Sequence, residues 1–72
     1  MSKYGHLWIY IDLIFKRTNK EKIELSFNQI KDTTGFEIDH SFLTYKKELL
    51  DYGYKVEKIK LKDKIIIFLK ID

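Results

Sequence analysis

Near its beginning the chain spaces its apolar residues as a helix does. One arc of a helical wheel over residues 4–17 holds most of the large side chains: Tyr4, Leu7, Trp8, Ile11, Ile14 and Phe15. This spacing predicts a first helix over residues 4–17. A strand is the alternative, because the segment LWIYI is rich in residues that favour strands. The helix is favoured because the apolar spacing continues through Phe15, beyond the length of a typical strand.

Two further apolar residues, Ile9 and Leu13, fall on the opposite side of this helix, near Lys16. They leave an apolar surface facing outward unless another part of the chain covers it. Coverage by the C-terminal strands or by the chain ends is one explanation. The other is a self-association face, through which two copies of the chain form a homodimer.

Local signals define the next two elements. Residues 22–26 (KIELS) alternate in polarity and predict a short strand. Ser26 and Gln29 then have the spacing of a capping box, in which each side chain bonds the backbone N–H of the other residue. A second helix is therefore expected over residues 27–34, with Gly35 in the left-handed conformation just past its end.

A third helix is expected between Gly35 and Gly53. Asp39 or Ser41 caps its beginning, and Gly53 ends it. Three residues form its inward side: Phe42, Tyr45 and Leu49. Leu43 and Leu50 flank them. Its outward side is a polar stripe of four residues: His40, Thr44, Lys47 and Asp51. Ser41 and Glu48 lie beside this stripe.

The remainder of the chain, residues 54–71, predicts one hairpin with its turn at residues 62–64. Its apolar positions change parity midway, which predicts a bulge near Glu57 and Lys58. The second strand is apolar on both faces, as expected of a central strand that is covered on both sides. The sequence therefore predicts one α+β domain over residues 1–72, with three helices and a small three-stranded antiparallel sheet in the order α-β-α-α-β-β.

Charge and cysteine content narrow the class of protein. The net charge is +3 and the pI is near 9.1, which permits contact with phosphates. Arg17 is the single arginine, so bidentate recognition of guanine is nearly absent. The chain has no cysteine and no recognisable signal peptide, and its apolar runs are too short to span a bilayer. These features fit a cytoplasmic protein that does not bind membranes.

No combination of residues indicates catalysis or metal binding. Asp39, His40 and Ser41 include the residue types of a hydrolase triad, but adjacent residues cannot place their side chains in the relay geometry. Helix capping explains Asp39 and Ser41 better. His6 and His40 are the histidines of the chain, and neither has acidic ligands at a suitable spacing. We therefore expect a non-enzymatic protein without a metal ion or cofactor.

Lysines alternate along the predicted hairpin, so that Lys60, Lys62 and Lys64 share a solvent face. Such a stripe could neutralise roughly two or three phosphates and give weak, salt-sensitive binding to nucleic acid. The alternative is that these lysines protect a solvated sheet edge from pairing with another chain.

The order and spacing of the elements resemble those of a winged helix-turn-helix domain over nearly the whole chain. The segments that carry the resemblance are LSFNQI (25–30), GFEIDHSF (35–42), KKELLDYGYKV (46–56) and KDKIIIF (62–68). Within them, LLDYGYKV is similar to the way such domains end the recognition helix in glycine and enter the wing. The chain also resembles a small uncharacterised bacterial and phage domain family of this type, with LSFxxI, then GFxI, then a serine.

The resemblance implies DNA binding, with the third helix in a major groove and the hairpin against the flanking backbone. The implied groove contacts are His40, Ser41, Thr44 and Lys47, and the implied wing contacts are Lys60, Lys62 and Lys64. The alternative is a protein-interaction module that keeps the fold without DNA binding. A small inhibitor of a host defence protein, encoded by a phage or mobile element, fits the size, lysine content and balanced charge.

Overall fold

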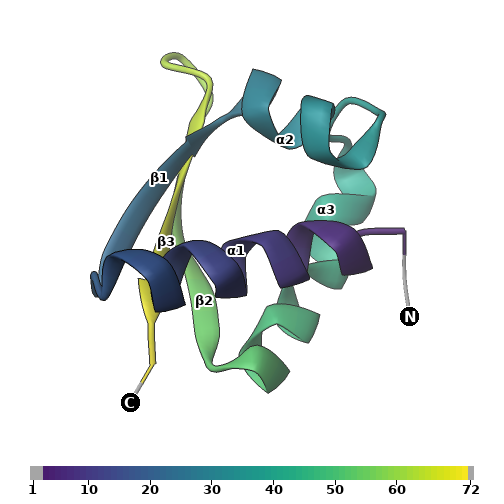
Figure 1. The fold of residues 1–72 in the computed structure, drawn as a ribbon. Coiled ribbons are helices and arrows are strands. Elements are labelled where there is room, and N and C mark those ends of the chain that lie inside the picture. The colour runs from purple at the N-terminus through teal and green to yellow at the C-terminus, as the bar shows by residue number, and fades with distance from the viewer. Residues whose placement is uncertain (1–2, 72) are drawn as a thin grey trace.

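The computed structural model describes residues 3–71 and shows an α+β fold (Figure 1). Residues 1, 2 and 72 of the expected domain lie outside the described residues. The elements are α1 (Gly5–Thr18), β1 (Lys22–Ser26), α2 (Phe27–Thr34), α3 (His40–Tyr45), the 3₁₀ helix η1 (Lys46–Tyr52), β2 (Tyr54–Lys60) and β3 (Ile65–Lys70). The predicted order of helices and strands is confirmed. In the described part of the chain, no helix has the length and apolar content needed to cross a bilayer.

The segment LWIYI is helical, which excludes the alternative of a strand there. The predicted apolar arc of α1 is turned inward, and the residues that it buries are Leu7, Trp8, Ile11 and Phe15. They share one core with residues of all three strands and with α2 and α3. Ile9 and Leu13 lie on the outer side of α1 and are 42% and 48% exposed, so neither β2 nor β3 covers them.

The junction between β1 and α2 forms as the sequence predicts. The Ser26 hydroxyl accepts a hydrogen bond from the Gln29 backbone N–H at 3.0 Å, and the Gln29 side-chain oxygen accepts one from the Ser26 N–H at 2.8 Å. This capping box satisfies two backbone donors and begins α2. Gly35 follows the helix with a φ of 86°, a left-handed conformation that glycine adopts without steric cost.

β3 is the central strand of the sheet, which has the order β1-β3-β2 with antiparallel pairing on both sides. Its residues Ile66, Ile67 and Phe68 are buried, so both faces of the strand are covered. The pairing register of β2 shifts between Val56 and Lys58, which confirms the predicted bulge. The turn spans residues 61–64, one residue more than predicted.

The third predicted helix is α-helical only over α3 and then tightens into η1. Three residues per turn place Lys46, Leu49 and Tyr52 on one side of η1, and each is buried or half-buried. The six residues of α3 bury a single side chain, that of Phe42. The inward positions expected from an unbroken α-helix are therefore wrong for three residues, which are exposed: Leu43 at 52%, Tyr45 at 38% and Leu50 at 51%.

An aromatic cluster holds α3 against the beginning of α1. The ring centroid of Tyr4 lies 5.6 Å from that of Phe42 and 5.4 Å from that of Phe36. The Trp8 ring lies 5.9 Å from the Phe42 ring. Because Tyr4, Trp8 and Phe42 are all buried, this cluster fixes which side of α3 faces outward.

Candidate functional site

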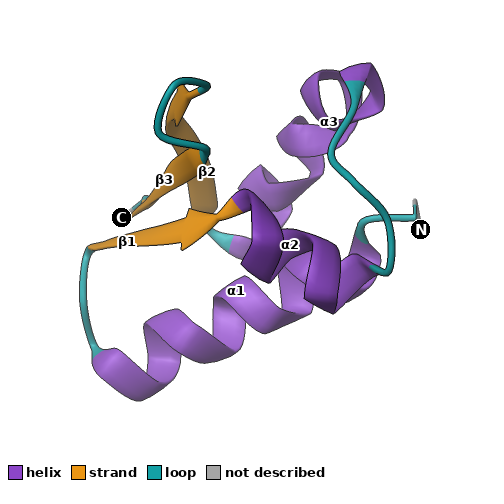
Figure 2. Cartoon of the chain, turned by 90° about the horizontal axis from the view of Figure 1, so that it is seen from above, coloured by secondary structure: helices purple, strands orange, loops and turns teal. Residues whose placement is uncertain are grey.

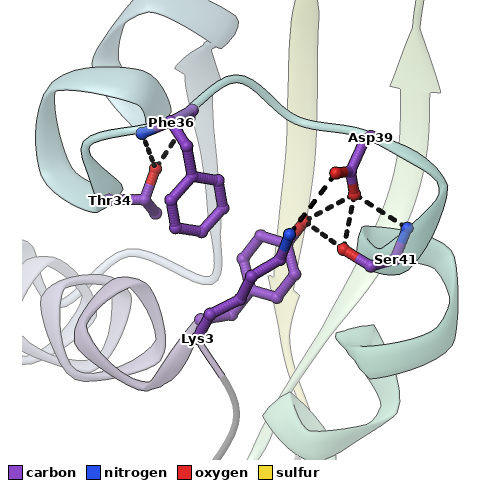
Figure 3. Close-up of polar contacts among 6 residues, drawn as sticks. Lys3, Thr34, Phe36, Asp39 and Ser41 are labelled. Carbon is purple, nitrogen blue, oxygen red and sulfur yellow. Dashed lines mark hydrogen bonds and ion pairs between the residues drawn. The ribbon is translucent and has the colours of Figure 1, made fainter.

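A polar network around Asp39 fixes the beginning of α3 (Figure 3). The Asp39 carboxylate accepts hydrogen bonds from the hydroxyl of Ser41 and, at 2.9 Å, from its backbone N–H. The Lys3 ammonium lies 3.4 Å from the same carboxylate, and the Tyr4 hydroxyl lies 3.0 Å from Ser41 Oγ. The hydrogen bonds from Ser41, helped by Lys3, lower the pKa of Asp39 from 3.8 to about 2. Asp39 is therefore a charged cap at neutral pH.

The four residues implied as groove contacts do not share one environment. His40 and Thr44 are exposed on α3, where residues one turn apart lie on the same side of a helix. Lys47 follows in η1 and is also exposed. Ser41 is half-buried, and its hydroxyl is engaged in the cap. Three of the four side chains are thus open to a ligand, while the fourth holds the helix in place.

The lysines implied as wing contacts lie at the tip of the hairpin. Lys60 ends β2 and is half-buried, whereas Lys62 and Lys64 are exposed in the turn. Lys64 has a φ of 56°, and its carbonyl accepts a hydrogen bond at 2.9 Å from the Phe27 N–H, which ties the tip to the beginning of α2. Figure 2 shows the hairpin tip and α3 together on the side of the molecule that faces away from α1.

Ion pairing divides the lysines into two groups. Within residues 3–71, the lysines that pair with a carboxylate all precede α3: Lys3 with Asp39, Lys16 with Asp12, Lys22 with Glu57, and Lys31 with Glu37. The lysines of η1, β2 and the turn form no ion pair with a described residue: Lys46, Lys47, Lys55, Lys58, Lys60, Lys62 and Lys64. Most of the basic side chains that form no ion pair in the described part of the chain therefore lie in residues 46–64, and the others are Arg17, Lys20 and Lys70.

The acidic residues of η1 lie differently from the sequence expectation. Glu48 was expected beside the outward stripe, and this is wrong, because it lies half-buried on the side of η1 that faces α1. Its carboxylate accepts a hydrogen bond at 2.9 Å from the indole N–H of Trp8. The 3₁₀ winding of η1 explains the difference, since it changes the direction of each side chain after Tyr45. Asp51 is exposed, as expected.

Two apolar depressions flank Leu43. The first, of about 360 Å³, lies between α3 and the hairpin and is lined by Phe27, Ile38, Asp39, His40, Phe42, Leu43, Ile59 and Leu61. The second, of about 190 Å³, is lined by Leu43, Lys46, Lys47, Leu50, Lys55 and Val56. Sequence reasoning missed both, because it turned Leu43 and Leu50 inward and assigned Leu61 to a strand. The pattern KLK (60–62), a leucine between two lysines, was a local signal that this leucine faces solvent. The turn leaves Leu61 74% exposed.

A separate apolar surface lies on the outer side of α1. Ile9 and Leu13 are one helical turn apart there, and Tyr10 is exposed beside them. This side of α1 is opposite the arc that the helix buries in the core. Self-association through Ile9 and Leu13 stays a prediction.

The described residues, 3–71, contain no group of three or more His, Cys, Asp or Glu side chains that could hold a metal ion. No protein-family model matches the chain, and no curated protein and no solved structure matches it either. The candidate site is therefore defined by geometry and charge alone, as the surface formed by α3, η1 and the hairpin tip.

Proposed function

We propose that this chain is a winged helix-turn-helix domain that binds nucleic acid and catalyses no reaction. In this proposal α3 and η1 act as the recognition helix, and the β2–β3 hairpin is the wing. His40, Thr44 and Lys47 contact the groove, while Ser41 holds the cap of α3. Lys60, Lys62 and Lys64 contact phosphates. The order of the elements and the common side taken by α3 and the hairpin tip support this assignment (Figure 2).

The observation that carries the proposal is that, within residues 3–71, the lysines of residues 46–64 form no ion pair. A lysine that bridges to a carboxylate must lose that bond before it can neutralise a phosphate. A lysine without such a partner releases condensed counterions from nucleic acid at no such cost. With a single arginine in the chain, we expect binding that depends strongly on salt and weakly on base sequence.

Fluorescence polarisation with a labelled random duplex, at low and at moderate salt, tests the proposal. We expect a Kd of about 10⁻⁴ to 10⁻⁶ M that weakens steeply with salt. The triple variant Lys60→Ala, Lys62→Ala, Lys64→Ala should lower the slope of log K against log salt by up to ~0.9 for each lost phosphate contact.

The matched control replaces three ion-paired lysines of the other group, as Lys16→Ala, Lys22→Ala, Lys31→Ala. It removes the same formal charge, so a general charge effect would lower both slopes equally. We expect the control to keep the slope of the parent. The nucleic-acid proposal fails if the parent does not bind at low salt, and the wing assignment fails if the two triple variants behave alike.

A protein-interaction module with the same fold is the second candidate function. The two apolar depressions beside Leu43 favour it, because apolar side chains of a partner can be desolvated there. Phosphates gain nothing from such surfaces. The same face therefore combines unpaired cations with apolar depressions.

A further inference from the structure

Leu43 is the wall that the two depressions have in common. Together with Leu50 and Leu61 it defines what we call the leucine face. Each of these three side chains is at least half exposed, at 52%, 51% and 74%. Leucines scattered singly on a surface are ordinary, but these three line two depressions that meet at Leu43.

The charges beside the leucine face are mostly positive. Lys46, Lys47 and Lys55 line the second depression, and none of them is paired within the described residues. The carboxylate that borders the first depression, that of Asp39, is engaged by Lys3 and Ser41. A ligand on this surface therefore meets apolar depressions together with lysines that form no ion pair in the described part of the chain.

We infer that the leucine face binds an acidic amphipathic helix of a partner protein. Apolar side chains on one face of that helix enter the depressions on both sides of Leu43, as in other complexes in which a helix lies in a groove. Carboxylates flanking the apolar stripe pair with Lys46, Lys47 and Lys55. The inference rests on the protein-interaction candidate and is independent of nucleic-acid binding.

A nucleobase is a poorer occupant of the depressions. The first depression is walled mainly by the side chains of Phe27, Ile38, Phe42 and Ile59, and its polar residues are Asp39 and His40. A base buried there would lose hydrogen bonds from water to most of its polar edge. An aliphatic side chain loses none, and the acidic residues beside it match the lysines of the second depression.

Fluorescence polarisation with a labelled synthetic peptide of about 18 residues tests the inference. The probe has leucines at i, i+3, i+4 and i+7, glutamates at the positions that flank this stripe and alanines elsewhere. One control has the same composition with the leucines scrambled, and another has lysines in place of the glutamates. We expect the first peptide to bind and both controls to bind at least about tenfold more weakly.

Variants of the full chain locate the peptide. Leu43→Ser should weaken binding about tenfold, because both depressions lose their common wall. Leu13→Ser, at a comparably exposed leucine of α1, is the matched control and should bind as the parent does. Circular dichroism confirms that both variants are folded.

Equal binding of the scrambled peptide, or equal effects of the two leucine variants, would overturn the inference. A duplex titration of the same samples separates the two proposals. Duplex binding without peptide binding overturns this inference alone. Peptide binding without duplex binding overturns the nucleic-acid proposal and leaves this inference standing. If both ligands bind, we expect them to compete, because both use lysines of residues 46–64.

Discussion

The part of the molecule that precedes α3 and the part formed by η1 and the hairpin use their side chains differently. Before α3, every described lysine except Lys20 pairs with a carboxylate, and the aromatic residues Tyr4 and Trp8 are buried with their polar atoms hydrogen-bonded. In η1, β2 and the turn, the lysines are unpaired within the described residues, and two leucines project outward.

This difference separates residues that hold the fold from residues that are available to a ligand. A group that is bonded within the chain must give up that bond before it can bind elsewhere, whereas an unpaired lysine or an exposed leucine need not. A small domain has little stability in reserve. We therefore expect substitutions of the residues that hold the fold to lower its stability, and substitutions of the available residues to leave its stability nearly unchanged.

The largest effect on stability is expected at Phe42, a core residue whose neighbour in sequence, Leu43, is exposed. Phe42→Ala should destabilise the fold by ~3–5 kcal/mol, because a ring packed against Tyr4 and Trp8 is lost. That is comparable to the whole stability of a domain of this size, about 3–5 kcal/mol, so the variant should be largely unfolded. Leu43→Ala, one residue later and exposed, should change stability by less than ~0.5 kcal/mol. Urea denaturation followed by circular dichroism measures the stability of both variants. Similar losses of stability would contradict the division between residues that hold the fold and residues that are available to a ligand.

A smaller loss is expected at the bond between α1 and η1. Glu48→Ala leaves the buried indole of Trp8 without this acceptor and should cost ~1–3 kcal/mol. Glu48→Gln keeps an acceptor oxygen and should cost less. Asp51→Ala, at the exposed acidic residue of η1, should stay within ~0.5 kcal/mol of the parent. The same denaturation experiment measures these variants. If Glu48→Ala leaves stability unchanged, the hydrogen bond between Trp8 and Glu48 does not hold η1 in place.

A pH-dependent effect is expected at Tyr54, whose hydroxyl donates to Asp12 at 2.6 Å. Burial, followed by the hydrogen bond to Asp12 and then the charge of Asp12, raises the pKa of Tyr54 from 10.0 to about 12. Between these values the unfolded chain has lost a proton that the folded chain retains, so stability falls as pH rises. Tyr54→Phe should lower stability by ~1 kcal/mol at neutral pH. Its stability should then fall less than that of the parent as the pH rises above 10.0.

Chemical denaturation of the parent and Tyr54→Phe from pH 7 to above pH 11 measures this difference. Tyr10→Phe, at an exposed tyrosine, is the control and should follow the parent. Parallel curves for the parent and Tyr54→Phe would contradict the proposed link between Tyr54 and Asp12. At the acid end, the hydrogen bond from Tyr54 lowers the pKa of Asp12, so that contribution is lost as pH falls below ~4.

The smallest effect on stability is expected on the outer side of α1. Ile9→Lys with Leu13→Lys changes exposed positions only, so stability should change by no more than ~0.5 kcal/mol. If α1 is a self-association face, analytical ultracentrifugation should show a dimer for the parent and a monomer for the variant. A parent that is monomeric at every concentration would exclude a homodimer through this surface.

Elements that are governed by local chemistry could be predicted from the sequence. The capping box of Ser26 and Gln29, and Gly35 after it, gave the bounds of β1 and α2 as observed. Apolar spacing gave α1 to within one residue at each end. The change of parity in the hairpin gave the bulge. In each case residues close in sequence determine the conformation.

The candidate site could be predicted only in part, because tertiary packing sets its geometry. Nothing in KKELLDY indicates that η1 winds as a 3₁₀ helix, and this winding turns Glu48 toward Trp8 and Leu50 toward solvent. The exposure of His40, Thr44 and Lys47 agrees with the predicted outward stripe. The apolar depressions depend on how α3 packs beside the hairpin, which no local pattern specifies.

Nucleic-acid binding by this surface is tested most directly by an NMR titration of the labelled full chain with a short random duplex, which reports a ligand contact at each backbone amide. We predict chemical-shift changes in α3, in the first residues of η1 and in residues 60–64, with α1 unchanged. Changes confined to α1, or no changes at low salt, would contradict the assignment of nucleic-acid binding to this surface.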